Sequence, residues 1–222
     1  MNSQMRKGKI GVVLAVAVLF TAAAQGLRAA VVDWTAVDNT ALTYEDGTPA
    51  PSSTLIFIGE FLLDDAQVTA NIANWLDADF RNANMRIFGS GVAATSAGNT
   101  PGLFQLQSDN DNPIFAGKPI GLLAVDVGAQ QVGAYKSTLS SWVFPTDADT
   151  EGTTAIDIQQ LITNDAQALF LIGAPGGGGG TTGDFGGFIF QSSVRMETIP
   201  EPTTAVLVGM SLLGVVAIRR RK

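Results

Sequence analysis

TLIFIGEF, at Thr54–Phe61, is the stretch that most clearly indicates the fold. Its β-branched and aromatic side chains favour a strand buried in a sheet. Other short runs of strand length follow at Met85–Phe88, Leu103–Gln107, Ile120–Val127, Val132–Lys136, Ser141–Phe144, Ala168–Ile172, Phe185–Gln191 and Val194–Glu197. Turn-forming Gly, Pro and Asn between such runs favour a sandwich over βαβ units, and Gly176–Gly180 is interpreted as a hairpin tip. The sequence predicts a mainly β, antiparallel, sandwich-like single domain over residues 31–198, with one or two short helices packed on it.

One segment changes period and predicts a helix. Apolar side chains at i, i+4, i+7, i+8 and i+12 share one helical face. They are Val68, Ile72, Trp75, Leu76 and Phe80. Asp64 and Asp65 stand where an N-cap belongs. We expect an amphipathic helix over about residues 66–81 and a second, shorter helical stretch that begins at Asp157.

The composition excludes several kinds of chemistry. The chain of 222 residues contains no Cys and no His. It therefore has no disulfide framework, no Ser-His-Asp triad, no Cys nucleophile and no Zn site of the usual ligands. Residues 31–199 carry five Lys or Arg and 19 Asp or Glu, so their net charge is −14, against −7 for the whole chain. This acidic body disfavours nucleic acid and anionic lipid as partners, because binding to phosphates relies on Lys and Arg.

Residues 1–30 predict export. Three cations within residues 6–9 precede an apolar run at Ile10–Phe20, which is the order of a secretory signal peptide that the Sec machinery would use. Small residues follow, and cleavage after Ala24 or after Ala30 are the two alternatives. We therefore expect an N-terminal signal helix that is removed, in preference to a permanent anchor.

Residues 199–222 combine three features of a sorting signal. They begin IPEP, in which the two prolines lack an N–H and favour an extended geometry that a processing enzyme can bind. Ala205–Ile218 carries no charge, and a helix over it would be roughly 21 Å long. The basic cluster at residues 219–222 is of the kind that stays on the cytoplasmic side of a membrane. This order predicts a transmembrane helix whose tail is later removed, with an uncleaved anchor as the alternative.

At these residues the chain resembles the PEP-CTERM proteins, which Gram-negative bacteria export and an exosortase recognises. The residues that carry the resemblance are Pro200, Glu201, Pro202, Arg219, Arg220 and Arg221. The small departure is Ile199, where Val is more usual. The resemblance implies an exosortase as partner, anchoring in the membrane before C-terminal processing, and release from it afterwards. It covers only the sorting signal at residues 199–222 and implies nothing about the body.

An acidic loop is the candidate for a metal site. Asp147, Asp149 and Glu151 fall at positions 1, 3 and 5 of a pattern like the EF-hand calcium loop. The pattern then departs from that loop, because Ile158 stands where the bidentate Glu belongs. A calcium loop of another kind and a solvated acidic turn are the two alternatives, and no other cofactor is predicted.

These observations predict an exported protein of the cell surface or of the extracellular matrix, in exopolysaccharide or biofilm. Its body would have a structural or adhesive role and would not be an enzyme. The alternative is a carbohydrate- or calcium-binding module of that matrix, and a glycan hydrolase with two carboxylates is less favoured. Exposure of Trp34, Trp75 and Trp142 separates the first two, because a sugar-stacking ring must reach the surface.

Overall fold

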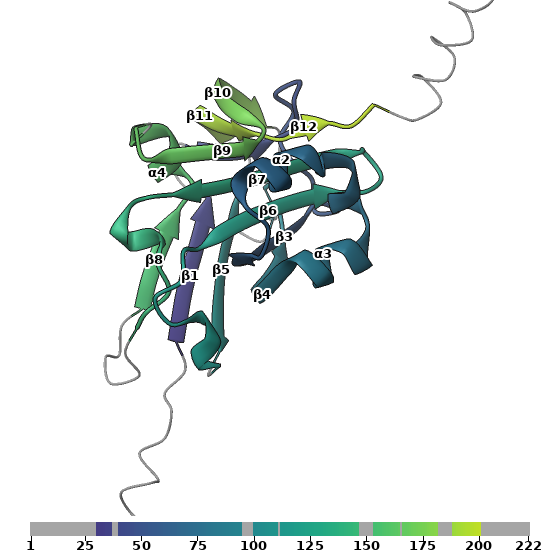
Figure 1. Cartoon of the computed structure of the whole chain (residues 1–222). Helices are drawn as coiled ribbons and strands as arrows, with labels where there is room; N and C mark the ends of the chain where they lie inside the picture. Colours follow the sequence, from purple (N-terminus) through teal and green to yellow (C-terminus); the bar gives the residue numbers. More distant parts are fainter. Residues whose placement is uncertain are drawn as a thin grey trace, which may run out of the picture.

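A computed structural model describes residues 30–36, 40–94, 100–110, 112–146, 153–164, 166–181 and 188–200 (Figure 1). The strands are β1 (Ala30–Ala36), β2 (Thr40–Thr43), β3 (Leu55–Phe61), β4 (Met85–Val92), β5 (Phe104–Asn110), β6 (Gly121–Asp126), β7 (Gln131–Ser137), β8 (Thr153–Asp157), β9 (Ala168–Ile172), β10 (Ala174–Thr181), β11 (Phe188–Arg195) and β12 (Glu197–Thr198). The α-helices are α2 (Asp65–Ala70), α3 (Ala78–Asn84) and α4 (Gln159–Thr163). The 3₁₀ helices are η1 (Ile72–Leu76), η2 (Pro113–Phe115) and η3 (Ser140–Trp142). The prediction of a mainly β fold with few short helices is confirmed.

The largest sheet, here called the large sheet, forms the centre of the molecule. Its strand order is β12-β7-β6-β3-β4, with β9 also paired to β7, and every pair is antiparallel. All six residues of β6 are buried. Side chains along a strand point alternately to the two faces, so Leu122 and Ala124 enter one hydrophobic cluster while Leu123 and Val125 enter another. The large sheet is therefore covered on both faces.

Two three-stranded sheets complete the β structure, in the orders β5-β1-β8 and β10-β11-β2. In each of them one pair is parallel, β1 with β8 and β11 with β2. The prediction of a wholly antiparallel fold is therefore wrong for these pairs. The physical reason is that the paired strands lie far apart in the sequence, so no hairpin dictates their direction. The residue pattern of a buried strand does not encode that direction either.

The first cluster fills the space between the large sheet and the two smaller ones. It contains Trp34 of β1, Leu42 of β2 and Ile56 of β3, all fully buried. In Figure 1 the strands β1, β5 and β8 run across the direction of β6 and β7. Two layers of strands therefore share one apolar core, with their strands crossing at a large angle (Figure 1).

The second cluster lies on the other face of the large sheet, beneath the helices. It joins Val68 and Trp75 to Leu123 of β6. The N-cap prediction is confirmed, because the Asp64 carboxylate accepts a hydrogen bond from the Gln67 amide in a capping box. These contacts place α2, η1 and α3 as a third layer.

The single helix predicted over residues 66–81 is wrong, because the segment forms α2, η1 and α3 in succession. Asp77 interrupts it with an extended backbone (φ −81°, ψ 130°) and caps α3 by accepting from the Phe80 amide. The Arg81 guanidinium then donates to the carbonyl oxygens of Trp75 and Leu76, both at 2.8 Å. The apolar residues still face the sheet, since the breaks fall at polar positions between them.

All three tryptophans are core residues with an exposure of 0%. Each indole N–H has a partner: Trp34 donates to Ser108 Oγ, Trp75 to the Val68 carbonyl and Trp142 to Gln160 Oε1. The interpretation of Trp75 as a core anchor is confirmed. In the described ranges no helix has the length and apolar character needed to cross a membrane. The predicted signal helix and the predicted C-terminal helix lie outside those ranges.

Candidate functional site at the C-terminal exit

The residues predicted to carry function fall mostly outside the described part of the chain. This holds for Glu201, Pro202, Arg219, Arg220 and Arg221 of the sorting signal, and for Asp147, Asp149 and Glu151 of the acidic loop. Pro200 is described, and it is exposed. The point at which the chain leaves the folded body is therefore the candidate site that the structure defines.

The last residues of the body form an edge strand. In β12, Glu197 lies opposite Val132 and Thr198 lies opposite Gln131, both of β7. The Ile199 amide donates to the Gln130 carbonyl oxygen over 2.8 Å, and its side chain is buried in the second cluster with an exposure of 7%. The chain therefore stays attached to the body up to the residue that precedes Pro200.

Side chains add a second set of contacts to this attachment. Gln131 Nε2 donates to the Thr198 hydroxyl oxygen at 2.6 Å, and the Thr198 amide donates to the Glu45 carboxylate at 3.1 Å. The Glu45 amide in turn donates to Gln131 Oε1 at 3.3 Å. The Thr198 hydroxyl and amide lower the pKa of Glu45 below its ordinary value, because both stabilise the carboxylate. We call Glu45, Gln130 and Gln131 the exit clamp.

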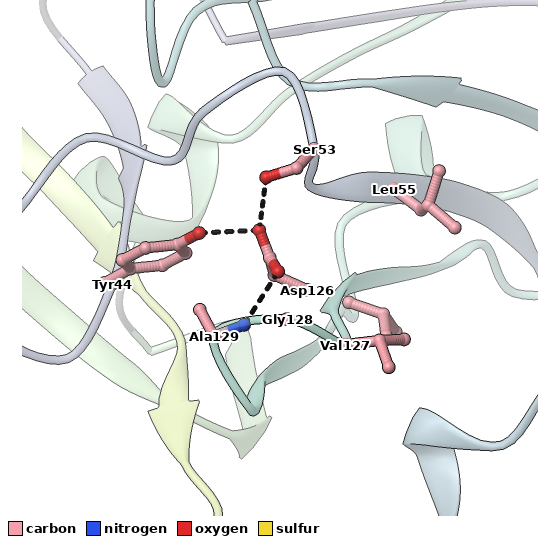
Figure 2. A pocket seen from close by; sticks show the side chains of 8 residues that line it. Tyr44, Ser53, Leu55, Asp126, Val127, Gly128 and Ala129 are labelled. Carbon is pink, nitrogen blue, oxygen red and sulfur yellow. Dashed lines mark hydrogen bonds between the residues drawn. The ribbon is translucent and has the colours of Figure 1, made fainter.

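A buried carboxylate lies behind the clamp, in a surface pocket. Figure 2 shows Tyr44 and Ser53 directed at the side chain of Asp126. One oxygen of Asp126 accepts from Tyr44 Oη at 2.6 Å, Ser53 Oγ at 2.7 Å and, more weakly, Thr54 Oγ1 at 3.2 Å. The other oxygen accepts from the Ala129 amide at 3.0 Å. The carboxylate therefore has donors on both oxygens.

Two pKa shifts describe the chemistry of this pocket. Burial alone would raise the pKa of Asp126, but the hydrogen bonds from Tyr44, Ser53 and the Ala129 amide outweigh it and lower the pKa below 3.8. Burial and the bond to Asp126 raise the pKa of Tyr44 to about 12. At neutral pH the pair is therefore a phenol that donates to a carboxylate, which is a stable structural pairing.

Asp126 supports the exit clamp through the turn that joins β6 to β7. Its bond to the Ala129 amide fixes that turn, and the Gln130 side chain donates to the Val127 carbonyl at 2.9 Å. Gln130 has a left-handed backbone (φ 54°), and its own carbonyl is the one that accepts from Ile199. The geometry of the turn thus sets the position at which the chain leaves the body.

Sequence reasoning did not predict the clamp or the Asp126 network. Asp126 lies near the end of the predicted strand Ile120–Val127, where a single acidic residue is typical of the start of an ordinary turn. Its partners Tyr44 and Ser53 are more than 70 positions away. In the described part of the chain no three acidic residues lie close enough together to hold a metal ion.

Comparison with known families identifies the tail. Residues 198–222 match the family model of the PEP-CTERM protein-sorting motif, so the resemblance seen in the sequence is confirmed. The motif implies an exported protein that is anchored in the membrane before processing, and its recognition by an exosortase. No curated protein and no solved structure matches the chain.

Proposed function

We propose that this chain is a structural or adhesive protein of the cell surface or extracellular matrix of a Gram-negative bacterium. In this proposal an exosortase cuts the exported chain at Pro200–Pro202, and the body then remains in the exopolysaccharide or biofilm. The body acts by its surface and its stability, without catalysis.

The observation that carries this proposal is the continuity between body and motif. The family match begins at Thr198, which is the last residue of β12. Pro200 is exposed and follows Ile199, which is the last buried residue of the described chain. This arrangement supports a folded cargo that is joined directly to its own sorting signal.

The charge and the carboxylate chemistry of the body agree with a role without catalysis. A net charge of −14 over residues 31–199 favours solubility and self-repulsion outside the cell. The buried carboxylate of Asp126 is held ionised by its donors, whereas a general acid needs a raised pKa. The pocket around it therefore fits a structural role better than acid–base work.

The carbohydrate-binding alternative loses the aromatic platform on which it depended. Trp34, Trp75 and Trp142 are fully buried, so none of them can stack on a sugar. Calcium binding by the loop at Asp147, Asp149 and Glu151 stays a prediction, because that loop lies outside the described residues.

The first test is the mass of the mature protein from its native host, with and without the exosortase. We expect the wild-type strain alone to yield a protein that lacks everything beyond Pro202 or its neighbours. A tail that ends at Lys222 in both strains would contradict sorting and leave a membrane-anchored surface domain. Immunodetection in the isolated matrix fraction then tests the destination.

A matched pair of variants sharpens this test. Glu201→Gln changes the central residue of the motif, and we expect it to accumulate with an intact tail. Glu197→Gln makes the same change on exposed β12, just outside the family match, and we expect normal processing. Equal processing of the two variants would show that the exosortase does not depend on Glu201 of the motif.

A further inference from the structure

The backbone amides just upstream of the motif already have hydrogen-bond partners in the folded body. Thr198 and Ile199 supply the two amides that precede Pro200, and both are bonded, to Glu45 and to the Gln130 carbonyl respectively. Pro200 and Pro202 have no N–H of their own. An enzyme that binds the segment as an extended strand uses such main-chain donors. On the upstream side of the motif, the nearest donors are therefore the two that the exit clamp holds.

The distance between the body and the motif leaves little room for an enzyme. Three residues after Ile199 reach at most ~10 Å when fully extended. A compact body formed by residues 31–199 has a radius of gyration of about 15 Å. A groove that closes around Pro200 and Pro202 would therefore lie within ~10 Å of Ile199 while Ile199 stays buried in its cluster.

The attachment is a short segment at the edge of the large sheet. β12 has two residues, both exposed, and it lies at the end of the strand order. When it detaches, β7 stays paired with β6 and with β9. Short exposed edge segments of this kind open at far lower free energy than the core of a domain.

We propose that processing requires β12 and Ile199 to detach from the body, so that the exit clamp controls the access of the exosortase to the motif. This inference rests on the proposed function and adds to it a regulatory role for the folded body. The fraction of molecules with an open clamp sets the rate at which the tail is removed.

A disulfide across β12 and β7 tests the inference directly. The bond from the Ile199 amide to the Gln130 carbonyl makes Thr198 and Gln131 a non-hydrogen-bonded antiparallel pair. Such pairs have Cα atoms about 4.5 Å apart, within the range that a disulfide accepts. Their side chains already meet at 2.6 Å, and the chain has no Cys that could pair wrongly.

We expect the full-length double variant Gln131→Cys/Thr198→Cys, when oxidised, to be exported and to keep its tail. Its processing should fall at least about tenfold below that of each single variant, and a reductant should restore it. Inserting Gly-Ser-Gly-Ser between Ile199 and Pro200 of the locked variant should also restore processing, because the insert supplies free upstream amides.

Three outcomes decide the matter. Processing of the locked variant at the wild-type rate overturns the inference and leaves the proposed function intact. Failure of the insertion to rescue the locked variant overturns it as well, because the disulfide would then act by another route. An uncut wild-type chain overturns the proposed function, and the inference that rests on it falls too.

A weakened clamp gives the opposite signature. Glu45→Ala removes the acceptor of the Thr198 amide without touching residues 198–222, and we expect processing about fivefold faster in pulse-chase measurements. Asp46→Ala is the matched control, since Asp46 is an exposed neighbour whose carboxylate accepts from the Thr48 amide within its own turn. Equal rates for the two variants would overturn the inference.

Discussion

β6 and β12 belong to the same sheet and show opposite ways of holding a strand. β6 has six buried residues and is paired on both sides, with β3 and β7. β12 has two exposed residues, and among the described strands it pairs with β7 alone. Burial on both faces makes β6 part of the global folding unit, whereas a few hydrogen bonds and one apolar side chain hold the chain at β12. We infer from this difference that β12 can detach from β7 while β6 and the rest of the fold stay intact.

The sharpest test of this comparison is a truncation in β6. Leu122→Ala removes a fully buried side chain from the first cluster, and we expect it to lower the free energy of unfolding by about 3 kcal/mol. Leu55→Ala in the adjacent strand β3 is the control, because Leu55 is 37% exposed and should cost less than about 1 kcal/mol. Urea denaturation followed by tryptophan fluorescence measures both. Equal losses would show that β6 is not the centre of stability.

The next largest effect is expected at Asp126, the last residue of β6, which fixes the turn that leads to the exit clamp. Asp126→Asn replaces one acceptor oxygen by an NH₂ group and removes the charge, so the donors Tyr44 and Ser53 lose a charged acceptor. We expect a loss of about 2 kcal/mol in the free energy of unfolding, from the same denaturation measurement. Asp46→Asn on the exposed neighbouring turn should change it by less than about 0.5 kcal/mol. A similar small change for both would mean that Asp126 supports nothing.

The centre of the large sheet could be predicted from sequence, because its signals are local. Thr54–Phe61 and Ile120–Val127 contain β3 and β6, whose bounds lie within one residue of those stretches. The Asp64 cap was also readable, since a capping residue acts on an amide three positions away. The sorting motif was the clearest signal of all, because the residues that an enzyme recognises there are contiguous in the sequence.

What could not be predicted depends on partners that are distant in sequence. Gly176–Gly180 lies within β10 and is not a hairpin tip. These glycines are held in a strand by pairing with β11, and a run of glycines does not itself indicate a strand. A Cβ at Gly179 would approach the ring of Phe190 to 2.8 Å, so the close packing requires glycine there. The clamp joins Glu45 to Thr198 across 153 positions, and no local pattern marks that pair.

The pH dependence of unfolding separates the pocket from the strands. Because folding raises the pKa of Tyr44 from 10.0 to about 12, its contribution to stability is complete below pH 10 and disappears as the pH rises towards 12. We expect Tyr44→Phe to make the loss of stability between pH 10 and 12 less steep. Part of the loss remains, because burial also raises the pKa of Tyr135. An unchanged slope would contradict the role given to Tyr44.

Asp126, in the same pocket, is expected to lose its contribution to stability at low pH and not at high pH. The folded pKa of Asp126 lies below its ordinary value of 3.8, so its contribution is complete above that pH and disappears as the pH falls further. Denaturation curves collected between pH 2 and 5 should show a smaller acid-induced loss for Asp126→Asn than for the wild type. Parallel curves would assign the acid sensitivity to other carboxylates.

The smallest global effect and the most local one are expected at β12. Thr198→Val keeps the β-branched shape but removes the hydroxyl that accepts from Gln131 and stabilises the Glu45 carboxylate, so the clamp is weakened. We expect the free energy of global unfolding to change by less than about 0.5 kcal/mol, while the Ile199 amide exchanges with solvent about fivefold faster. Amides of β6 should keep their protection, and Glu197→Gln on the same strand should leave the Ile199 amide unaffected. If Ile199 and β6 instead exchanged together, β12 would open only when the whole sheet unfolds, and the contrast between the two strands would disappear.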